Sequence, residues 1–284
     1  MRLSIVIVSY NVGNYLKNCL ESVQKTTKNL QPGIIVVDNN ARDNSIEILK
    51  KEFPEVSVIK NSKNYGFARG ANIGMRQAGG EFVLLLNPDT LVSECTITSL
   101  LEYMESHPDV GILGPQLQDP DGSLQHSCRS FPTWSVYFSN RQSLLNRFFP
   151  SNKWSNKYLL KQIDHKQIQE VDWITGCCLL LRKKMLEEID YLDEDFFMYI
   201  EDVDIARRAE AKNWKVVYFP QARLIHYKSK SVLQNRLGML VEHHRSMYQY
   251  YLKHFPKNPV VRVLVFGGIF LRLGLSVLGI KLKS

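Results

Sequence analysis

The sequence predicts an α/β protein built on an open, mainly parallel, twisted sheet that is flanked by helices. Short apolar runs rich in β-branched residues alternate with amphipathic helical patterns between Leu3 and Leu113. The runs are apolar throughout, which is typical of strands whose two faces are both covered. With 284 residues, of which 44% are hydrophobic, the chain is long enough to bury a sizeable core.

The expected elements alternate between strand and helix. Strands are expected at Leu3–Ser9, Ile34–Val37, Val56–Ile59, Phe82–Leu86 and Val110–Leu113. Helices are expected through Leu16, Leu20 and Val23, and at Ser45–Phe53, Gly70–Ala78 and Thr96–His107. Residues from about Cys128 to Glu170 show little periodicity, which predicts a variable excursion. Regular patterns resume after it: an apolar run at Val171–Arg182, a helix at Asp202–Lys212, a strand at Lys215–Phe219 and a helix at Leu233–His254 are expected.

The five cysteines indicate neither a disulfide framework nor a zinc knuckle, because their number is odd and none are spaced as C-x-x-C. We therefore expect a reducing compartment. The N-terminus has one arginine and a short apolar run but no small-residue cleavage site, so it predicts a strand and not a signal peptide.

The net charge of +8 is concentrated at the C-terminal end of the chain. From His226 to Ser284 there are ten lysines and arginines and one acid, Glu242, so this end carries +9 and the first 225 residues carry −1. Such a local excess indicates an anionic partner, either a membrane surface or a nucleic acid.

Polar clusters follow four of the expected strands. They are Ser9-Tyr10-Asn11, Asp38-Asn39-Asn40, the glycine-containing Asn64–Asn72 and Asn87-Pro88-Asp89. Ligands of open parallel sheets bind beyond the carboxyl ends of the strands, so these clusters predict one shared crevice. Taken alone, Asp38 could cap a turn and Asn87-Pro88-Asp89 could form one. The glycine segment matches neither the dinucleotide fingerprint nor the P-loop.

Together with Thr175-Gly176 and Glu201-Asp202, these clusters resemble the family 2 inverting glycosyltransferases of the GT-A fold, in particular the bacterial rhamnosyltransferase-like group. The resemblance covers roughly residues 3–250. It implies transfer of a sugar from a nucleotide-diphosphate donor, dTDP-rhamnose or a UDP-sugar, to a hydroxyl of a glycan or lipid-linked acceptor in cell-surface polysaccharide synthesis. We expect a nucleotide-sugar-binding half at 1–120, an acceptor-binding and catalytic half at 121–230, and basic, membrane-associating helices at 231–284.

The resemblance also assigns roles to the residues of the crevice. Asp38 would accept a hydrogen bond from the pyrimidine N3–H of the donor, which a carboxylate can do. The rest of the nucleotide-sugar pocket would be lined by Ser9, Tyr10, Asn11, Gly66, Arg69, Asn72, Asn87 and Asp89.

A divalent cation would stabilise the departing diphosphate. The family's D-x-D motif is Asn87-Pro88-Asp89 here, so Asp89 is the expected principal ligand. His226 is a candidate second ligand, and a histidine packed at the end of a strand is the alternative. Oxygen ligands with one imidazole favour Mg²⁺ or Mn²⁺ over zinc.

Inversion by direct displacement requires a base on the acceptor side of the sugar. The resemblance assigns this role to Asp202, with Glu201 holding the acceptor or orienting the loop. Helix capping is the alternative for these acids. Because a helix N-terminus lowers the pKa of a carboxyl group, we expect Asp202 to be ionised and weakly basic.

The segment Trp173-Ile174-Thr175-Gly176 resembles the acceptor or donor loop of the family. Gly176 would let the backbone approach the sugar. Trp173 would either stack on a pyranose ring or lie in the core. Cys177 and Cys178, in an apolar run, are expected to be core residues and not nucleophiles.

Residues 260–280 are mostly apolar, and Arg262, Arg272, Ser276 and Lys283 share one polar stripe of the expected helix. This pattern predicts an interfacial helix on an anionic membrane, with docking on the catalytic domain as the alternative.

We expect no nucleic-acid partner, since no nucleic-acid-binding motif is present. The expected location is the cytoplasm, peripheral on the inner face of the cell membrane, close to a polyprenyl-diphosphate-linked acceptor. A catalytically silent sugar-nucleotide-binding or scaffold protein remains the alternative function.

Overall fold

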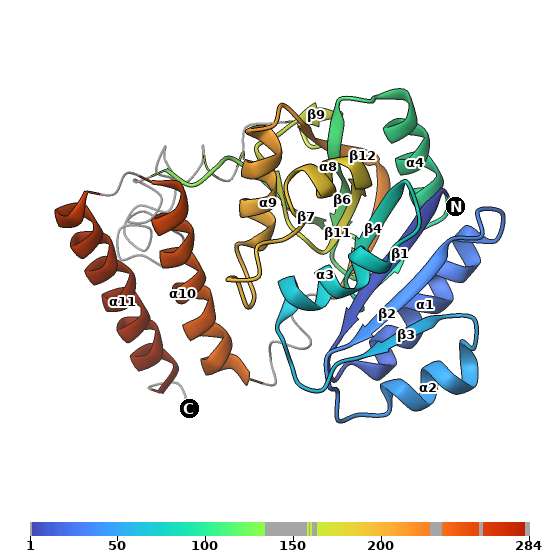
Figure 1. Cartoon of the computed structure of the whole chain (residues 1–284), viewed down its shortest axis with the longest axis horizontal. Coiled ribbons are helices and arrows are strands. Elements are labelled where there is room, and N and C mark those ends of the chain that lie inside the picture. Colours follow the sequence, from blue (N-terminus) through green and yellow to red (C-terminus); the bar gives the residue numbers. More distant parts are fainter. Residues whose placement is uncertain are drawn as a thin grey trace.

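A computed structural model describes residues 2–133, 158, 160, 164–227, 235–255 and 258–281. One large sheet forms the centre, helices cover both of its faces, and a pair of C-terminal helices lies to one side (Figure 1). The fold class is as predicted, except that the sheet is mixed in direction.

The sheet has the strand order β3-β2-β1-β4-β11-β6-β12-β5, with β7 paired to β6 and β9 to β12. Its first four strands are parallel, whereas β11 runs antiparallel to both of its neighbours. The bounds along the chain are β1 Leu3–Ser9, β2 Gly33–Asp38, β3 Ser57–Lys60, β4 Phe82–Leu86, β5 Thr90–Val92, β6 Val110–Gln118, β7 Leu124–Gln125, β9 Gln169–Glu170, β11 Cys178–Arg182 and β12 Lys215–His226. A separate two-stranded sheet joins β8, Cys128–Arg129, to β10, Trp173–Ile174.

Alternate side chains of the strands enter two hydrophobic clusters, one on each face of the sheet. Ile5 and Ile7 of β1 pack with the helices α1 and α4, whereas Val6 and Val8 pack with α3 and α9. The helices are α1 Gly13–Thr27, α2 Ser45–Glu52, α3 Phe67–Gln77, α4 Thr96–Ser106, α8 Lys183–Glu188 and α9 Glu201–Glu210. The covered, apolar strands expected from the sequence are therefore confirmed.

Most expected elements are present within a few residues of their predicted bounds. Helix α3 begins at Phe67, before the expected Gly70, and β12 continues past Phe219 to His226. The sequence pattern did not predict β5 or α8. Most of the aperiodic excursion expected around Cys128 to Glu170 lies outside the described residues.

Two antiparallel helices follow the sheet, α10 at Arg236–His254 and α11 at Pro259–Lys281 (Figure 1). They pack on each other through a small cluster formed by Met247, Tyr251, Val265 and Ile269. Helix α10 is tied to α9 by His254, whose Nε2 lies 2.7 Å from a carboxylate oxygen of the buried Asp204. Within the described residues, α11 is the one helix long and apolar enough to cross a membrane.

Candidate active site

The carboxyl ends of β1 and β2 lie side by side, as the predicted crevice requires. Ser9 and Asp38 are direct neighbours in the parallel register, and the Asn39 N–H donates to the Ser9 carbonyl at 2.9 Å. Ser9 is buried with an Oγ atom that lacks a hydrogen-bond partner. Tyr10 and Asn11 follow it at the half-buried rim of the sheet, where Asn11 Oδ1 accepts from the Arg42 N–H at 2.6 Å.

Asp38 combines a structural contact with a free acceptor. One carboxylate oxygen, Oδ1, accepts from the Ala41 N–H at 3.0 Å, as in the capping alternative. No described residue donates to Oδ2, so that oxygen is available to a ligand. Burial raises the pKa of Asp38 above its ordinary value.

Asn39, which belongs to one of the predicted polar clusters but was given no role of its own, organises the loop that contains Gly66. Its Nδ2 donates to Asn64 Oδ1 at 3.0 Å and to the Gly66 carbonyl at 2.8 Å. Its Oδ1 accepts from Asn61 Nδ2 and from the Tyr65 N–H. Because the amide nitrogen of Asn39 donates and its amide oxygen accepts, the side chain fixes the loop between β3 and α3.

Gly66 is required by a close approach of two backbones. Its φ is +83°, and a Cβ atom there would lie 2.3 Å from the Phe197 carbonyl oxygen. The next residue, Phe67, donates its N–H to the same oxygen at 2.7 Å. The glycine loop therefore rests on the segment that precedes α9.

The two other predicted residues of this loop make protein contacts. Arg69 is half-exposed, with its guanidinium 4.5 Å from the centre of the Tyr65 ring and 3.7 Å from Glu194. Asn72 is buried and is bonded through both ends of its amide to Leu192, and also to Glu194. The described contacts of Asn72 are structural, and its contact with a donor stays a prediction.

The segment Thr175–Cys177 joins the donor side of the crevice to the acids of α9. The Asn87 N–H donates to the Cys177 carbonyl at 2.8 Å, and the Gly176 N–H donates to Asp202 Oδ2 at 3.0 Å. The thiol of Cys177 is buried, and the charges of both Asp89 and Asp202 contribute to the raised pKa of this thiol. Residues expected to act on the two substrates are thus brought together around one short segment.

Asp202 is held on two sides. In addition to the Gly176 contact, its Oδ1 accepts from the N–H of Val203 at 2.9 Å. Burial nevertheless raises the pKa of Asp202, against the lowering effect of both hydrogen bonds and of the charge on Arg129. The expectation of a lowered pKa at the helix N-terminus is wrong, because desolvation outweighs these contributions.

Glu201 is buried, and its Oε2 atom has no hydrogen-bond partner. Its pKa is raised, first by burial and then by the adjacent charge of Asp202. The preceding residues Tyr199 and Ile200 both have φ near +70°, which is rare for a β-branched side chain. Such strained backbone is a feature of functional sites.

His226 and Asp89 face each other, with Nε2 and Oδ1 3.5 Å apart. The neighbouring Gln125 fixes the tautomer of His226. Because Gln125 Nε2 faces three carbonyl or carboxylate oxygens, its Oε1 accepts the proton of His226 Nδ1, 3.1 Å away. The other ring nitrogen, Nε2, faces the carboxylate, and it is the nitrogen that would bind a cation shared with Asp89.

This donor set fits a divalent cation that is held jointly with a ligand. One carboxylate and one oriented imidazole are suitable for Mn²⁺ or Mg²⁺, and phosphate oxygens would supply further donors. Within the described parts of the chain, no group of three or more His, Cys, Asp or Glu side chains could hold a metal ion by itself.

Trp173 and Thr175 both contact the segment 127–130. Trp173 is buried in the hydrophobic cluster beneath α9, and its indole N–H donates to the Ser130 carbonyl at 2.9 Å. This placement favours the core alternative over stacking on a sugar. Thr175 donates through its N–H and its hydroxyl to the Ser127 carbonyl. Cys177 and Cys178 are buried, as expected.

Arg129 is a site residue that sequence reasoning missed. Its charge lowers the pKa of Asp202, so its guanidinium lies within electrostatic reach of that carboxylate. Only a single arginine in an aperiodic stretch marks it in the sequence, and such a signal is too weak to find it.

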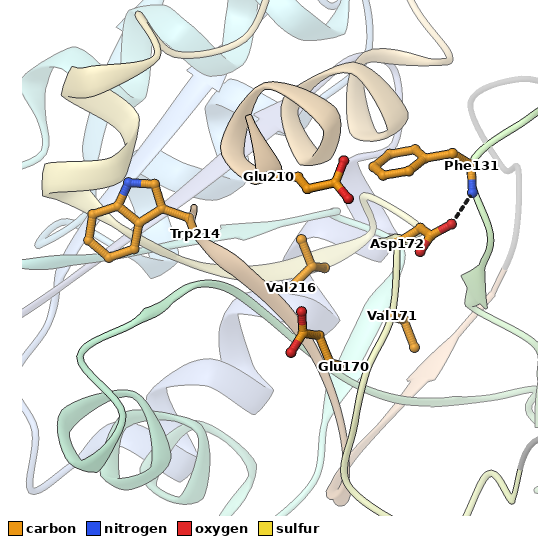
Figure 2. A pocket seen from close by; sticks show the side chains of 7 residues that line it. All are labelled: Phe131, Glu170, Val171, Asp172, Glu210, Trp214 and Val216. Carbon is orange, nitrogen blue, oxygen red and sulfur yellow. Dashed lines mark hydrogen bonds between the residues drawn. The ribbon is translucent and has the colours of Figure 1, made fainter. Parts of the chain in front are cut away.

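A separate cavity of about 250 Å³ opens near the far end of α9. Figure 2 shows the acids Glu170, Asp172 and Glu210 around it, with Asp172 accepting from the Phe131 N–H. Glu210 ends α9 whereas Asp202 begins it, a separation of about 12 Å along the helix axis. This cavity is therefore distinct from the crevice.

The architecture recurs in solved structures of nucleotide-sugar transferases. S. aureus TarS in complex with UDP-GlcNAc superposes with a TM-score of 0.61 at 15% identity, covering 96% of this chain and 72% of that chain. The mannosyltransferase PcManGT from Pyrobaculum calidifontis, in complex with GDP-Man and Mn²⁺, gives a TM-score of 0.59 at 13% identity, covering 100% and 76%. The fold is the GT-A fold of glycosyltransferases.

Within that class, the chain belongs to glycosyl transferase family 2, whose model matches residues 4–190. It is 30% identical over 257 residues to an N-acetylglucosaminyl-diphospho-decaprenol L-rhamnosyltransferase of Mycobacterium tuberculosis, covering 87% of this chain and 82% of the relative. It is 25% identical over 231 residues to the rhamnosyltransferase WbbL of Escherichia coli, covering 78% and 82%. The protein is therefore a rhamnosyltransferase-like glycosyltransferase.

Proposed function

We propose that the protein transfers a sugar, with inversion, from a nucleotide-diphosphate donor to a hydroxyl of a polyprenyl-diphosphate-linked acceptor in cell-surface polysaccharide synthesis. dTDP-rhamnose is the preferred donor, and a UDP-sugar is the second choice. The relative from M. tuberculosis, named for a diphospho-decaprenol-linked substrate and for L-rhamnose, supports both assignments. The enzyme would work in the cytoplasm, on the inner face of the membrane.

One observation carries the proposal: the Thr175–Cys177 segment bonds to Asn87 on one side and to Asp202 on the other. An acceptor hydroxyl at Asp202 would therefore lie next to a donor whose diphosphate is bound near Asn87 and Asp89. Asp202 would accept the hydroxyl proton as the sugar is transferred, and its raised pKa makes it a stronger base than an ordinary aspartate. Glu201 would hold the acceptor or orient the loop.

On the donor side, Asp38 Oδ2 would accept the base N3–H, and the backbone around Ser9 would line the pocket together with the neighbouring loops. Asp89 and His226 would hold Mn²⁺ or Mg²⁺. When bound, the cation would neutralise charge on the leaving diphosphate.

A donor panel tests the substrate. Thermal shift with dTDP-rhamnose and with UDP-sugars, in Mn²⁺ or Mg²⁺, should show the largest stabilisation with dTDP-rhamnose. Release of nucleotide diphosphate in the presence of a lipid-linked acceptor then measures transfer. A panel in which no sugar nucleotide stabilises the protein would contradict the proposal.

Asp202→Asn tests the mechanism and the silent-protein alternative. We expect kcat to fall by about 10³-fold, because the base is lost, while the donor still produces its thermal shift. Asp190→Asn, at an exposed acid paired with Arg76, is the matched control and should leave kcat unchanged. Wild-type turnover by Asp202→Asn would show that the base is another group.

A further inference from the structure

Arg272, in the middle of α11, is a partly buried cation that forms no hydrogen bond or ion pair with any residue the structure describes. Its Nε and Nη1 atoms are inaccessible to solvent and make no hydrogen bond. No ion pair to a described acid reaches its guanidinium, and α11 itself contains no Asp or Glu. An unpaired buried charge is costly, so a group of this kind is expected to meet an anion.

The register of the two C-terminal helices places Arg272 opposite the histidine pair of α10. Val265 and Ile269 pack on Met247 and Tyr251, and Arg272 follows Ile269 on the same helical face. Since α10 and α11 are antiparallel (Figure 1), one further turn along α11 corresponds to one turn back along α10, which reaches His243 and His244. The sequence places Arg262 and Arg272 in one polar stripe, but the two side chains differ in exposure: Arg262 is exposed, whereas Arg272 is partly buried.

His243 and His244 provide no negative charge. His244 is fully buried; its Nδ1 donates to the Leu240 carbonyl, so its Nε2, which has no partner, is an acceptor in the neutral ring. Burial, followed by the charges of His244 and Arg272, lowers the pKa of His243 to about 4, and burial and the charge of Arg272 also lower the pKa of His244. The acid nearest in sequence, Glu242, pairs with Arg245. Arg272 is thus the charged member of this cluster, and no described acid is its counter-ion.

This cluster lies close to the acids of α9. Tyr158 interacts electrostatically with both Arg272 and Asp202, so one tyrosine lies near both groups. His243 also packs edge-on against Tyr199, with ring centres 5.3 Å apart, and Ser246 donates to the Met198 carbonyl at 2.9 Å. The histidine pair therefore lines the segment that leads into the catalytic helix.

We propose that Arg272 and His243 bind the phosphate groups of a diphosphate ester, and thereby position the acceptor hydroxyl at Asp202. The identity of this ester as the sugar acceptor rests on the proposed function, but the existence of a diphosphate site does not. The exposed apolar side chains of α11, among them Val263 and Leu271, would accommodate the lipid of such an acceptor.

Inorganic diphosphate is the probe that tests the site. The full-length protein in detergent, with EDTA to remove divalent cations, is titrated by calorimetry. We expect Arg272→Gln to weaken binding by about tenfold or more, because charge-assisted hydrogen bonds are lost. Arg262→Gln removes the same charge from an exposed position of the same helix, so its affinity should stay within about twofold of wild type.

Two further variants distinguish loss of binding from loss of folding. Arg272→Lys keeps the charge and should retain most of the affinity. His243→Gln changes α10 and not α11, yet should also weaken binding. Equal affinity of wild type and Arg272→Gln, or equal loss in Arg262→Gln, would overturn the proposal.

Vesicles of phosphatidylglycerol separate a diphosphate ester from a lipid headgroup. We expect Arg272→Gln to sediment with these vesicles as wild type does. Loss of sedimentation with unchanged diphosphate affinity would mean that Arg272 binds phospholipid headgroups instead, and would overturn the assignment. The titration needs neither donor nor metal, so a failure of the transferase proposal would leave its result unaffected.

Discussion

Two adjacent acids at the start of α9 are held in different ways. Both oxygens of Asp202 accept backbone hydrogen bonds, which stabilise its charge, whereas Glu201 is buried with an unpartnered oxygen. Environments that separate the pKa values of two carboxyl groups allow one to be ionised while the other keeps its proton. We infer that Asp202 is the ionised member of the pair.

Glu201→Gln should change the pH dependence of stability. The pKa of Glu201 is raised in the folded protein, so its ionisation opposes folding, and stability is lost as the pH rises above about 4.5, the ordinary value. The loss accumulates between pH 4.5 and the pKa in the folded protein, about 8, so the advantage of Glu201→Gln in free energy of unfolding should be larger at about pH 8 than at about pH 5. Urea denaturation measures it, and the exposed Glu187→Gln is the control. A pH-independent difference would contradict the raised pKa.

His226→Ala should raise the Mn²⁺ concentration needed for half-maximal activity by about tenfold, since an oriented imidazole is lost from the metal. His107→Ala, at the end of α4 and bonded to Tyr103, is the control. The measurement is a metal titration of transferase activity after dialysis against EDTA. Wild-type activity that survives chelation would remove the metal role of both Asp89 and His226.

At the scale of elements, the loop before α3 and the segment before α9 are in direct contact, and this contact is called the α3–α9 joint below. Gly66 touches the Phe197 backbone, and Asn72, one turn inside α3, bonds to the Leu192 backbone. Helix α3, which follows this loop, is thus fixed against the segment that leads to the acids at the start of α9.

Gly66→Ala should disrupt the α3–α9 joint. The added Cβ would meet the Phe197 carbonyl, and the left-handed φ is strained for alanine, so we expect a loss of about 2 kcal/mol or more in unfolding free energy. Gly122→Ala is a matched control, because Gly122 has nearly the same φ, +84°, and open space around it. It should cost about 1 kcal/mol. Equal losses in urea denaturation would show that the contact with Phe197 is unimportant.

Periodicity was sufficient to predict most strands and helices but not their direction. The apolar run at Cys178–Leu181 would look the same in a parallel or an antiparallel strand, and its reversal depends on pairing with β4 and β6. Motifs located Asp38, Asp89 and Asp202, which lie at strand ends or a helix start. They included Asn39 without revealing its role, and they missed Gln125 and Arg129, because the contacts of these residues join segments distant in sequence or have no local pattern.

At the scale of the whole molecule, the basic excess of the sequence coincides with the helix pair α10 and α11, beside the sheet (Figure 1). Much of the apolar surface of α11 is uncovered: Val263 and Leu271 are 70% and 67% exposed. Apolar area of this kind next to basic residues suits an anionic bilayer.

Val263→Glu combined with Leu271→Glu should reduce sedimentation with phosphatidylglycerol vesicles by about tenfold or more, because two apolar contacts with lipid are replaced by charges. Ile168→Glu places the same charge at an exposed apolar residue of the catalytic domain and should have little effect. Unchanged sedimentation of the double variant would contradict a membrane-facing α11.

Because strand β11 runs antiparallel to β4, hydrogen exchange at one backbone amide can report on the crevice. Strand β4 ends at the crevice and the antiparallel β11 begins there. The Asn87 N–H, just after β4, therefore donates to the Cys177 carbonyl, just before β11, although the two residues are far apart along the chain. Deuterium uptake at the Asn87 amide therefore reports directly on whether the donor side and the acid side are in contact. This proton continues the β4–β11 pairing, in which Leu86 faces Cys178, so it should exchange when that end of the pairing opens, and substrates that bind there should lengthen its lifetime.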